Sequence, residues 1–233
     1  MHALDLAKPF IDIGLTTARG GAMLAFWQGE AGLEYEGPLP IRRGLIQHRH
    51  RAGGSIVKIN LRDAPPPQTP PSGYSELLIA RPGLDQPRAL TDPDGNRLCL
   101  WPQGRDSVEQ IAVRLKVRDL ARHREFYSRV LGLEECPPTP SGEVVFAAGA
   151  SRVWLEQSAD APDDAAFEGF GWRYITFQVF RVDAIHAAVL AAGGREAMTP
   201  TTLGDTARIS MVRDPDGNWI ELSQRRSIVG SLD

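Results

Sequence analysis

The pentapeptide Asp-Pro-Asp-Gly-Asn occurs twice in this chain, at Asp92–Asn96 and again at Asp214–Asn218, about half the chain apart. Asp-Gly and Gly-Asn pairs favour a tight turn, because glycine and asparagine tolerate positive φ angles that other residues avoid. Each copy is followed by a short apolar run typical of a strand, Arg97–Trp101 and Trp219–Leu222. This repeat predicts one architecture used twice, with a boundary near Pro102–Ser107.

The second half of the chain has the periodicities of strands and amphipathic helices. Residues Ile111–Val117 alternate apolar and polar side chains, which predicts a strand, and Asp119 is placed to cap a following helix. Another alternating strand, Tyr174–Phe180, precedes a second helix over Asp183–Ala192, which ends at two glycines. The predicted order is strand, helix and further strands, and then the same order again.

The first half begins in the same way and then departs from this order. Its predicted elements are a short helix over Ala22–Gln28 and the strands Ile11–Thr16, Leu45–Arg51, Ser55–Leu61 and Tyr74–Ala80. Where a second helix is expected, residues Arg81–Arg88 contain Pro82, Gly83 and Pro87, which oppose a helix. We therefore predict that the first half lacks its second helix.

Composition excludes several classes of protein. The 233 residues carry 26 Lys and Arg against 29 Asp and Glu, so the excess of basic residues typical of a nucleic-acid-binding protein is missing. No apolar run is long enough to span a membrane, and the N-terminus lacks a signal-peptide pattern. Only two cysteines occur, Cys99 and Cys136, which favours a reducing cytoplasm over a disulfide framework.

Two segments carry a resemblance to a known superfamily. They are Val117–Leu133 and Asp214–Leu222, with weaker counterparts over Phe26–Glu36 and Asp92–Trp101. In these segments the chain resembles the vicinal oxygen chelate superfamily, which includes glyoxalase I, bleomycin-resistance proteins and extradiol dioxygenases. The resemblance implies an α+β fold of paired βαβββ modules that form two open half-barrel domains. We expect four modules, in domains 1–104 and 105–233, with the second helix of the first domain lost.

In this superfamily a divalent metal sits in the half-barrel. Its ligands come from the first strand of a module and from the strand after the Asp-Pro-Asp-Gly turn. In the second half these positions fall on Ala112, Tyr174 and Glu221, with Trp154 or Glu156 on the middle strand. None of them is a histidine and few are carboxylates, so we do not expect a standard metal site in the second domain.

The matching positions of the first half are chemically richer: Asp12, Lys58 or Asn60, Glu76 and Cys99. Alternation also puts His48 and His50 on one face of their strand. One interpretation is a cavity that binds a divalent metal (iron, manganese, nickel or zinc) through Asp12, His48, His50 and Glu76. The alternatives are acid–base chemistry without a cofactor, because a carboxylate near His or Lys tunes both pKa values, and a solvent-exposed strand face.

The second half is expected to form a pocket without a metal. Arg114 shares the strand face of Ala112, so it could hold an anion opposite Tyr174 and Glu221. We assign catalytic roles to Glu221, Tyr174 and Arg114, and ligand contacts to Lys58, Asn60, Trp154, Glu156 and Gln178. We expect His123 and His186 at the surface, and Cys99 packed as a small hydrophobic residue.

The resemblance implies an enzyme that acts on a small oxygen-rich or aromatic metabolite, by lyase, isomerase or ring-cleaving chemistry. The alternative is a metal-free protein that binds or sequesters a small molecule, as bleomycin-resistance proteins do. We also expect a homodimer in the cytoplasm that binds neither nucleic acid nor a membrane.

Overall fold

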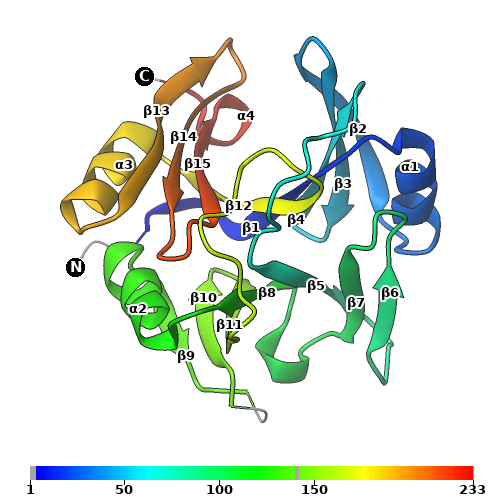
Figure 1. Cartoon of the computed structure of the whole chain (residues 1–233), viewed down its shortest axis with the longest axis horizontal. Helices are drawn as coiled ribbons and strands as arrows, with labels where there is room; N and C mark the ends of the chain where they lie inside the picture. Colours follow the sequence, from blue (N-terminus) through cyan, green and yellow to red (C-terminus); the bar gives the residue numbers. More distant parts are fainter. Residues whose placement is uncertain (1–3, 140–141, 233) are drawn as a thin grey trace.

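The computed structural model describes residues 4–139 and 142–232, which form two mixed β-sheets and short helices (Figure 1). The larger sheet has eight strands in the order β13-β14-β15-β12-β1-β4-β3-β2. In that order the strands span Arg195–Leu203, Ala207–Arg213, Trp219–Arg225, Gly171–Val179, Leu6–Thr17, Ser55–Arg62, Leu45–Ala52 and Glu34–Arg42. This mixture of helices and open sheets confirms the predicted α+β class.

The smaller sheet has seven strands in the order β6-β7-β5-β8-β11-β10-β9. These strands span Arg88–Thr91, Arg97–Pro102, Tyr74–Arg81, Ile111–Val117, Ser151–Gln157, Val144–Ala148 and Glu134–Cys136. The helices are α1 (Gly20–Gly29), α2 (Leu120–Glu125) continued by the π-helix η2 (Phe126–Val130), α3 (Val182–Ala191) and α4 (Arg226–Val229), with one 3₁₀ turn, η1 (Arg105–Ser107). Within the described residues, none of the helices is long and apolar enough to cross a membrane.

Each sheet takes strands from both halves of the chain. In the larger sheet, β1 pairs antiparallel with β12, and Ile13 lies opposite Ile175. In the smaller sheet, β5 pairs antiparallel with β8, and Leu77 lies opposite Val113. The first module therefore pairs with the fourth and the second with the third. The division at residue 104 stays a prediction about the repeat in the sequence, while the half-barrels form across it.

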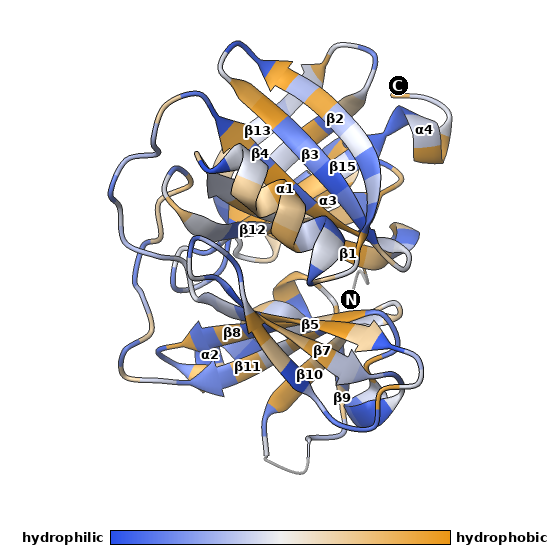
Figure 2. Ribbon diagram, turned by 90° about the vertical axis from the view of Figure 1, so that its right-hand side faces the viewer, coloured by the Kyte–Doolittle hydropathy of each residue, from blue (hydrophilic) through white to orange (hydrophobic). Residues whose placement is uncertain are grey.

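One apolar core joins the two sheets. It contains alternate residues of the central strands of both sheets, such as Ile13 on β1 and Val113 on β8, together with Trp27 of α1, Tyr127 of η2 and Val189 of α3. Figure 2 shows the two tiers, with α1 and α3 beside the larger sheet and α2 beside the smaller one. Because these side chains fill the helix-side faces, the opposite face of the larger sheet is left to line a cavity, whereas that of the smaller sheet carries a second apolar cluster that includes Trp154 and Cys99.

Both copies of the repeated turn have the same hydrogen bonds. The Asp92 carboxylate accepts from the amides of Asp94 and Asn96, and the Asp214 carboxylate accepts from those of Asp216 and Asn218. The fourth residue of each turn is a glycine with positive φ, which explains the repeated Asp-Gly. The second copy also ties the halves together, because the Asn218 Oδ1 accepts from the Gly73 amide at 2.6 Å.

The missing helix of the first half is confirmed. The described residues between β5 and β6 form only turns and bends, where α3 stands in the second half. Strand β2, which was not predicted from the sequence, lies at the edge of the larger sheet and contains Pro38 and Pro40. Proline is compatible with an edge strand because its missing N–H need not join a ladder.

Candidate functional site

The concave face of the eight-stranded sheet gathers polar side chains from its four central strands. Alternation and register set this face: Lys58 on β4 lies beside Gly14 on β1, Gly14 lies opposite Tyr174 on β12, and Thr176 lies beside Glu221 on β15. Lys58, Tyr174, Thr176 and Glu221 are all buried residues. Two sequence-distant halves thus meet at one buried polar cluster.

Lys58 lies at the centre of this cluster. Its Nζ donates to Glu221 Oε2 at 2.7 Å and to Thr176 Oγ1 at 2.6 Å, and Thr176 Oγ1 donates in turn to Glu221 Oε2 at 2.6 Å. An ammonium group has three N–H donors, so one remains for a ligand. Glu221 Oε1 makes no hydrogen bond within the described chain, so the site offers one free donor and one free carboxylate oxygen side by side.

The hydroxyl of Tyr174 ends a polarised chain of side chains. Arg49 donates to Gln47 Oε1, Gln47 Nε2 donates to Asn60 Oδ1, and both amide groups direct N–H bonds at the Tyr174 oxygen, at 3.4 and 3.2 Å. Arginine cannot accept, and Asn60 Nδ2 also donates to the Leu15 carbonyl, so both amide orientations are fixed. The phenol oxygen therefore accepts twice, and its own hydrogen is left to donate.

Burial first, and the Glu221 charge second, raise the pKa of Tyr174 far above its ordinary value. The phenol therefore stays protonated and acts as a hydrogen-bond donor. Its position depends on Gly14, because a Cβ there would lie 2.3 Å from the Tyr174 ring. The Lys58 Nζ lies 5.2 Å from the centre of the same ring, a favourable cation–π distance.

Two adjoining hollows open onto this face. The first, about 390 Å³, is called the apolar hollow and is lined largely by Leu45, Phe167, Met198, Leu203, Met211 and Trp219. The second, about 480 Å³, is called the polar hollow and is lined by Lys58, Gln178, Thr202, Thr206, Ser223 and Arg225. Gln47, Ile209 and Glu221 line both, so the free Glu221 oxygen lies where the two hollows meet.

The residues at the superfamily's metal positions do not fit a divalent metal here. In the larger sheet these positions hold Asp12, Lys58, Tyr174 and Glu221, and the ammonium of Lys58 already pairs with Glu221. The Asp12 carboxylate is held by Lys8, the Ile56 amide and Gln178. Among the described residues there is no group of three or more His, Cys, Asp or Glu side chains that could hold an ion. The donor set instead places a fixed cation in the cavity.

The predicted metal set of Asp12, His48, His50 and Glu76 is not brought together. His48 lies opposite Ile59 and His50 opposite Val57, so both histidines share the helix-side face with these core residues. His50 is fully buried and makes a tilted ring contact with Tyr35, whose hydroxyl lies 2.6 Å from His48 Nδ1. Lys58 and Asn60 point to the other face, where their partners are Arg49 and Gln47. The alternation along β3 was predicted correctly, but the face that carries His48 and His50 points to the helix side and not to the cavity.

Glu76 and Arg114 lie in the seven-stranded sheet, away from Tyr174 and Glu221. Glu76 pairs with Arg97 at 3.2 Å and with Arg114 at 3.6 Å. The Arg114 guanidinium lies 5.1 Å from the ring of Trp154, which is buried in a small apolar cluster with Cys99. Glu156 is on the same strand as Trp154. The predicted catalytic trio is therefore split: Glu221 and Tyr174 meet, whereas Arg114 serves the other sheet.

His123 and His186 are buried, contrary to the predicted surface positions. His123 Nε2 lies 3.5 Å from Asp214 and 3.6 Å from Asp216 of the second turn. Burial alone would lower the pKa of His123, but these carboxylates raise it above the ordinary value. His186 pairs with Glu196 at 2.7 Å, which ties α3 to β13. Both histidines hold helices to the fold.

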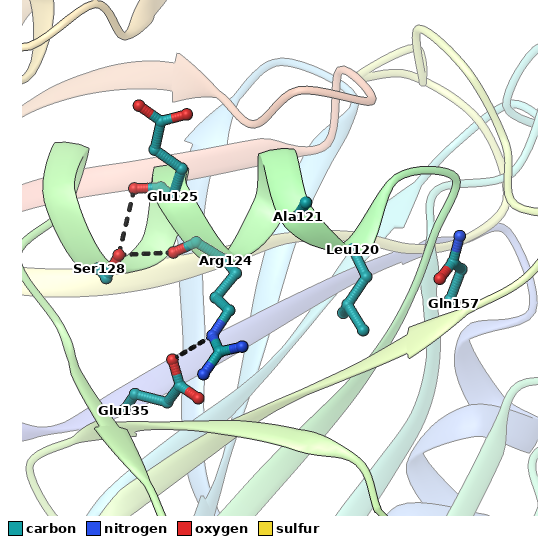
Figure 3. Close-up of a pocket in the computed structure, with 7 residues that line it drawn as sticks. All are labelled: Leu120, Ala121, Arg124, Glu125, Ser128, Glu135 and Gln157. Atoms are coloured by element: carbon teal, nitrogen blue, oxygen red, sulfur yellow. Dashed lines mark hydrogen bonds and ion pairs between the residues drawn. The ribbon is translucent and has the colours of Figure 1, made fainter.

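A third hollow, of about 580 Å³, lies over α2 and is shown in Figure 3. Its polar groups already have partners, since Arg124 pairs with Glu135 at 2.6 Å and Ser128 donates to the Arg124 carbonyl. No described side chain there is buried, charged and free, so the hollow offers nothing to recognise a ligand.

Three site residues carried no sequence prediction: Gln47, Gly14 and Arg225. Gln47 belongs to the strand face opposite the histidines, which the predicted orientation turned away from the cavity. Gly14 interrupts an apolar strand, and such a glycine often marks a place where another group approaches closely. That signal could have identified the position beneath Tyr174.

Comparisons with known proteins agree with this architecture. Residues 108–222 match the family model of the Glyoxalase/Bleomycin resistance protein/Dioxygenase superfamily. No curated protein sequence matches the chain. Glyoxalase I from Zea mays is similar in structure, with a TM-score of 0.76 and 14% identity, over 99% of this chain and 95% of that chain. A putative dioxygenase from Bacillus subtilis has a TM-score of 0.71 and 11% identity, over 96% of this chain and 86% of that chain.

Identities this low establish a common fold and leave the reaction and substrate open. The matched segment contains α2, the second repeated turn and Glu221, and the shared fold extends through the first half. By sequence, residues 108–222 match the Glyoxalase/Bleomycin resistance protein/Dioxygenase superfamily, and over its whole length the chain shares the fold of glyoxalase I.

Proposed function

We propose that the concave face of the eight-stranded sheet is the active site of a metal-independent enzyme that moves a proton at a carbon next to a carbonyl group. The observation that carries this proposal is the cluster of Lys58, Glu221 and Tyr174 at the junction of the two hollows. It supplies a free carboxylate oxygen and two free donors in one buried place.

The proposed chemistry uses the atom of each group that has no hydrogen-bond partner in the cluster. Glu221 Oε1 takes the proton from carbon, and the electron pair of the broken C–H bond moves to the carbonyl oxygen. The third N–H of Lys58 and the hydroxyl hydrogen of Tyr174 stabilise the resulting enolate oxygen. Glu221 then returns the proton to the same carbon, which is hydrogen exchange. If that carbon carries a hydroxyl whose proton passes to the enolate oxygen, Glu221 can instead protonate the former carbonyl carbon, which completes an isomerisation. If the next carbon carries a leaving group, the enolate re-forms the carbonyl, its electron pair makes the new C=C bond, and the group departs with its bonding pair, which completes an elimination.

The test is hydrogen exchange measured by ¹H NMR in D₂O, with ketones that carry an aryl or alkyl group. The wild type is expected to exchange the hydrogen next to the carbonyl, and Glu221→Gln to slow the exchange about 100-fold or more. Glu156→Gln, a carboxylate of the other sheet, should exchange at the wild-type rate. Treatment with a chelator should leave the wild-type rate unchanged. Exchange that persists in Glu221→Gln, or that stops with the chelator, would contradict the proposal.

The second candidate is a protein that binds a small molecule without chemistry. It is favoured by the aromatic wall of the apolar hollow, where the Phe167 ring lies 5.6 Å from Tyr174 and 4.9 Å from Trp219. In that case Glu221→Gln would change affinity and no ketone would exchange. A homodimer and a reducing, cytoplasmic location are also proposals, the latter supported by two free cysteines.

A further inference from the structure

An unpaired cation lies at the far end of the polar hollow. Arg225 lines this hollow, is only partly exposed, and makes no side-chain hydrogen bond or ion pair with any described residue. Burial first, and the neighbouring Arg49 second, lower the pKa of Arg225, and the charges of Glu36, Asp12 and Glu221 offset this only in part. An anion beside Arg225 would remove this cost.

The acidic groups around Arg225 are committed elsewhere. Glu221 pairs with Lys58 at 2.7 Å, and Asp12 pairs with Lys8 at 2.7 Å. Glu36 is shared by Arg49 and Arg51, at 2.6 and 3.2 Å. These three carboxylates pair with four other cations, so none of them is left to pair with Arg225. The polar hollow is therefore electropositive at this end.

A second buried group of the same hollow is also unsatisfied. Gln178 is 3% exposed and donates to Asp12 Oδ2, which fixes its amide orientation, yet its Oε1 has no hydrogen-bond partner. A buried acceptor without a partner is costly, so it indicates a donor supplied from outside the chain. The polar hollow is thus built to contact a polar, charged molecule.

Strand geometry sets the order of these groups. Arg225 follows Glu221 by four residues on β15, so both side chains point to the same face, with Cα atoms about 13 Å apart. The apolar hollow lies on the other side of Glu221. A molecule that crosses the junction would place an apolar group, a carbonyl and an anion in that order.

Resting on the proposed function, we propose that the substrate is an anionic carbonyl compound whose carboxylate pairs with Arg225. Its carbonyl oxygen lies at Lys58 and Tyr174, and its aryl or alkyl body fills the apolar hollow. Arg225 would then determine specificity, and it lies four residues along β15 from Glu221, the base that removes the proton.

The test uses benzoylalkanoates with two to four methylene groups between the ketone and the carboxylate, together with their methyl esters. Affinity for each is measured by isothermal titration. The wild type is expected to bind at least one acid about 10-fold or more tightly than its ester, because an ester cannot form the charge-assisted pair. Arg225→Gln should abolish this preference and Arg225→Lys should keep part of it. Arg226→Gln, an exposed neighbour, should retain it in full.

Equal affinity for acid and ester in the wild type, no binding of any acid, or a preference that survives in Arg225→Gln would overturn the anion site. Hydrogen exchange on the same compounds separates this result from the proposed function. If acid and ester bind equally well and exchange hydrogen at equal rates, the pairing with Arg225 is contradicted and the proposed chemistry is not. A preference lost in Arg225→Gln without any exchange would support the anion site and sink the chemistry.

Discussion

His50 shows what burial does to a titratable side chain that receives no partner. Its ring is fully buried and neither nitrogen has a hydrogen-bond partner. Burial first, and the nearby His48 second, lower the pKa of His50 to about 4. In the unfolded chain the pKa of this histidine is near 6.5, so between pH 6.5 and 4 the unfolded chain binds a proton that the folded chain does not bind. His50 therefore reduces the free energy of unfolding as the pH falls from 6.5 towards 4.

We expect His50→Phe to remove this acid sensitivity while keeping the ring contact with Tyr35. The free energy of unfolding, measured by urea titration between pH 7 and 4.5, should fall by about 2 kcal/mol less in the variant than in the wild type. His123→Phe is a control in which the pH dependence of the free energy of unfolding should change in the opposite direction. The raised pKa of His123 stabilises the fold below pH 6.5, and this stabilisation is lost as the pH rises through the folded pKa. Parallel pH curves for wild type and His50→Phe would contradict the expectation.

Strand β3 marks how far the sequence reaches at the scale of an element. Its extent and alternation were predictable, because Leu45–Arg51 alternates and turns flank it. The inward face was not, because both faces carry polar residues: His48 and His50 on one, Gln47 and Arg49 on the other. Only the register with β4, which puts His50 opposite Val57, decides between them. A one-residue shift exchanges the faces of a whole strand.

The two faces of β3 predict different results for neighbouring variants. Gln47→Ala should weaken binding of an aryl ketone about 3- to 10-fold, because Tyr174 loses one of its two orienting donors. His48→Ala, one position away on the helix-side face, should leave that affinity unchanged. Isothermal titration on both variants checks the assignment. Equal losses in the two would show that the face is wrongly assigned.

At the scale of the whole molecule, the repeat predicted the fold, and the pairing of the modules decided the site. Asp12, Lys58, Tyr174 and Glu221 were all found from their positions in the repeat. The sequence could not show that the first module joins the fourth, because strand pairing between distant segments leaves no local pattern. For that reason Glu76 was grouped with Asp12, and Arg114 with Tyr174 and Glu221, although both lie in the other sheet. The ion pair between Lys58 and Glu221 was not predicted.

This pairing predicts how the halves behave when separated. Residues 105–233 alone would expose the β1-facing edge of β12 and the β5-facing edge of β8. Open edges of central strands are sites of association. We expect this fragment to self-associate or precipitate, and to form a one-to-one complex with native-like circular dichroism when co-expressed with residues 1–104. Analytical ultracentrifugation checks both, and a stable monomeric fragment would argue that the halves are independent domains.

The Lys58–Glu221 pair spans 163 residues of sequence. During synthesis, Lys58 leaves the ribosome long before its partner carboxylate exists, and β1 waits for β12 in the same way. The first module must therefore remain unfinished until β12 and β15 emerge, with a cationic side chain and an open edge exposed to the surroundings. The site would be complete only after β15 has been synthesised, so a chain truncated before β15 would have no working site.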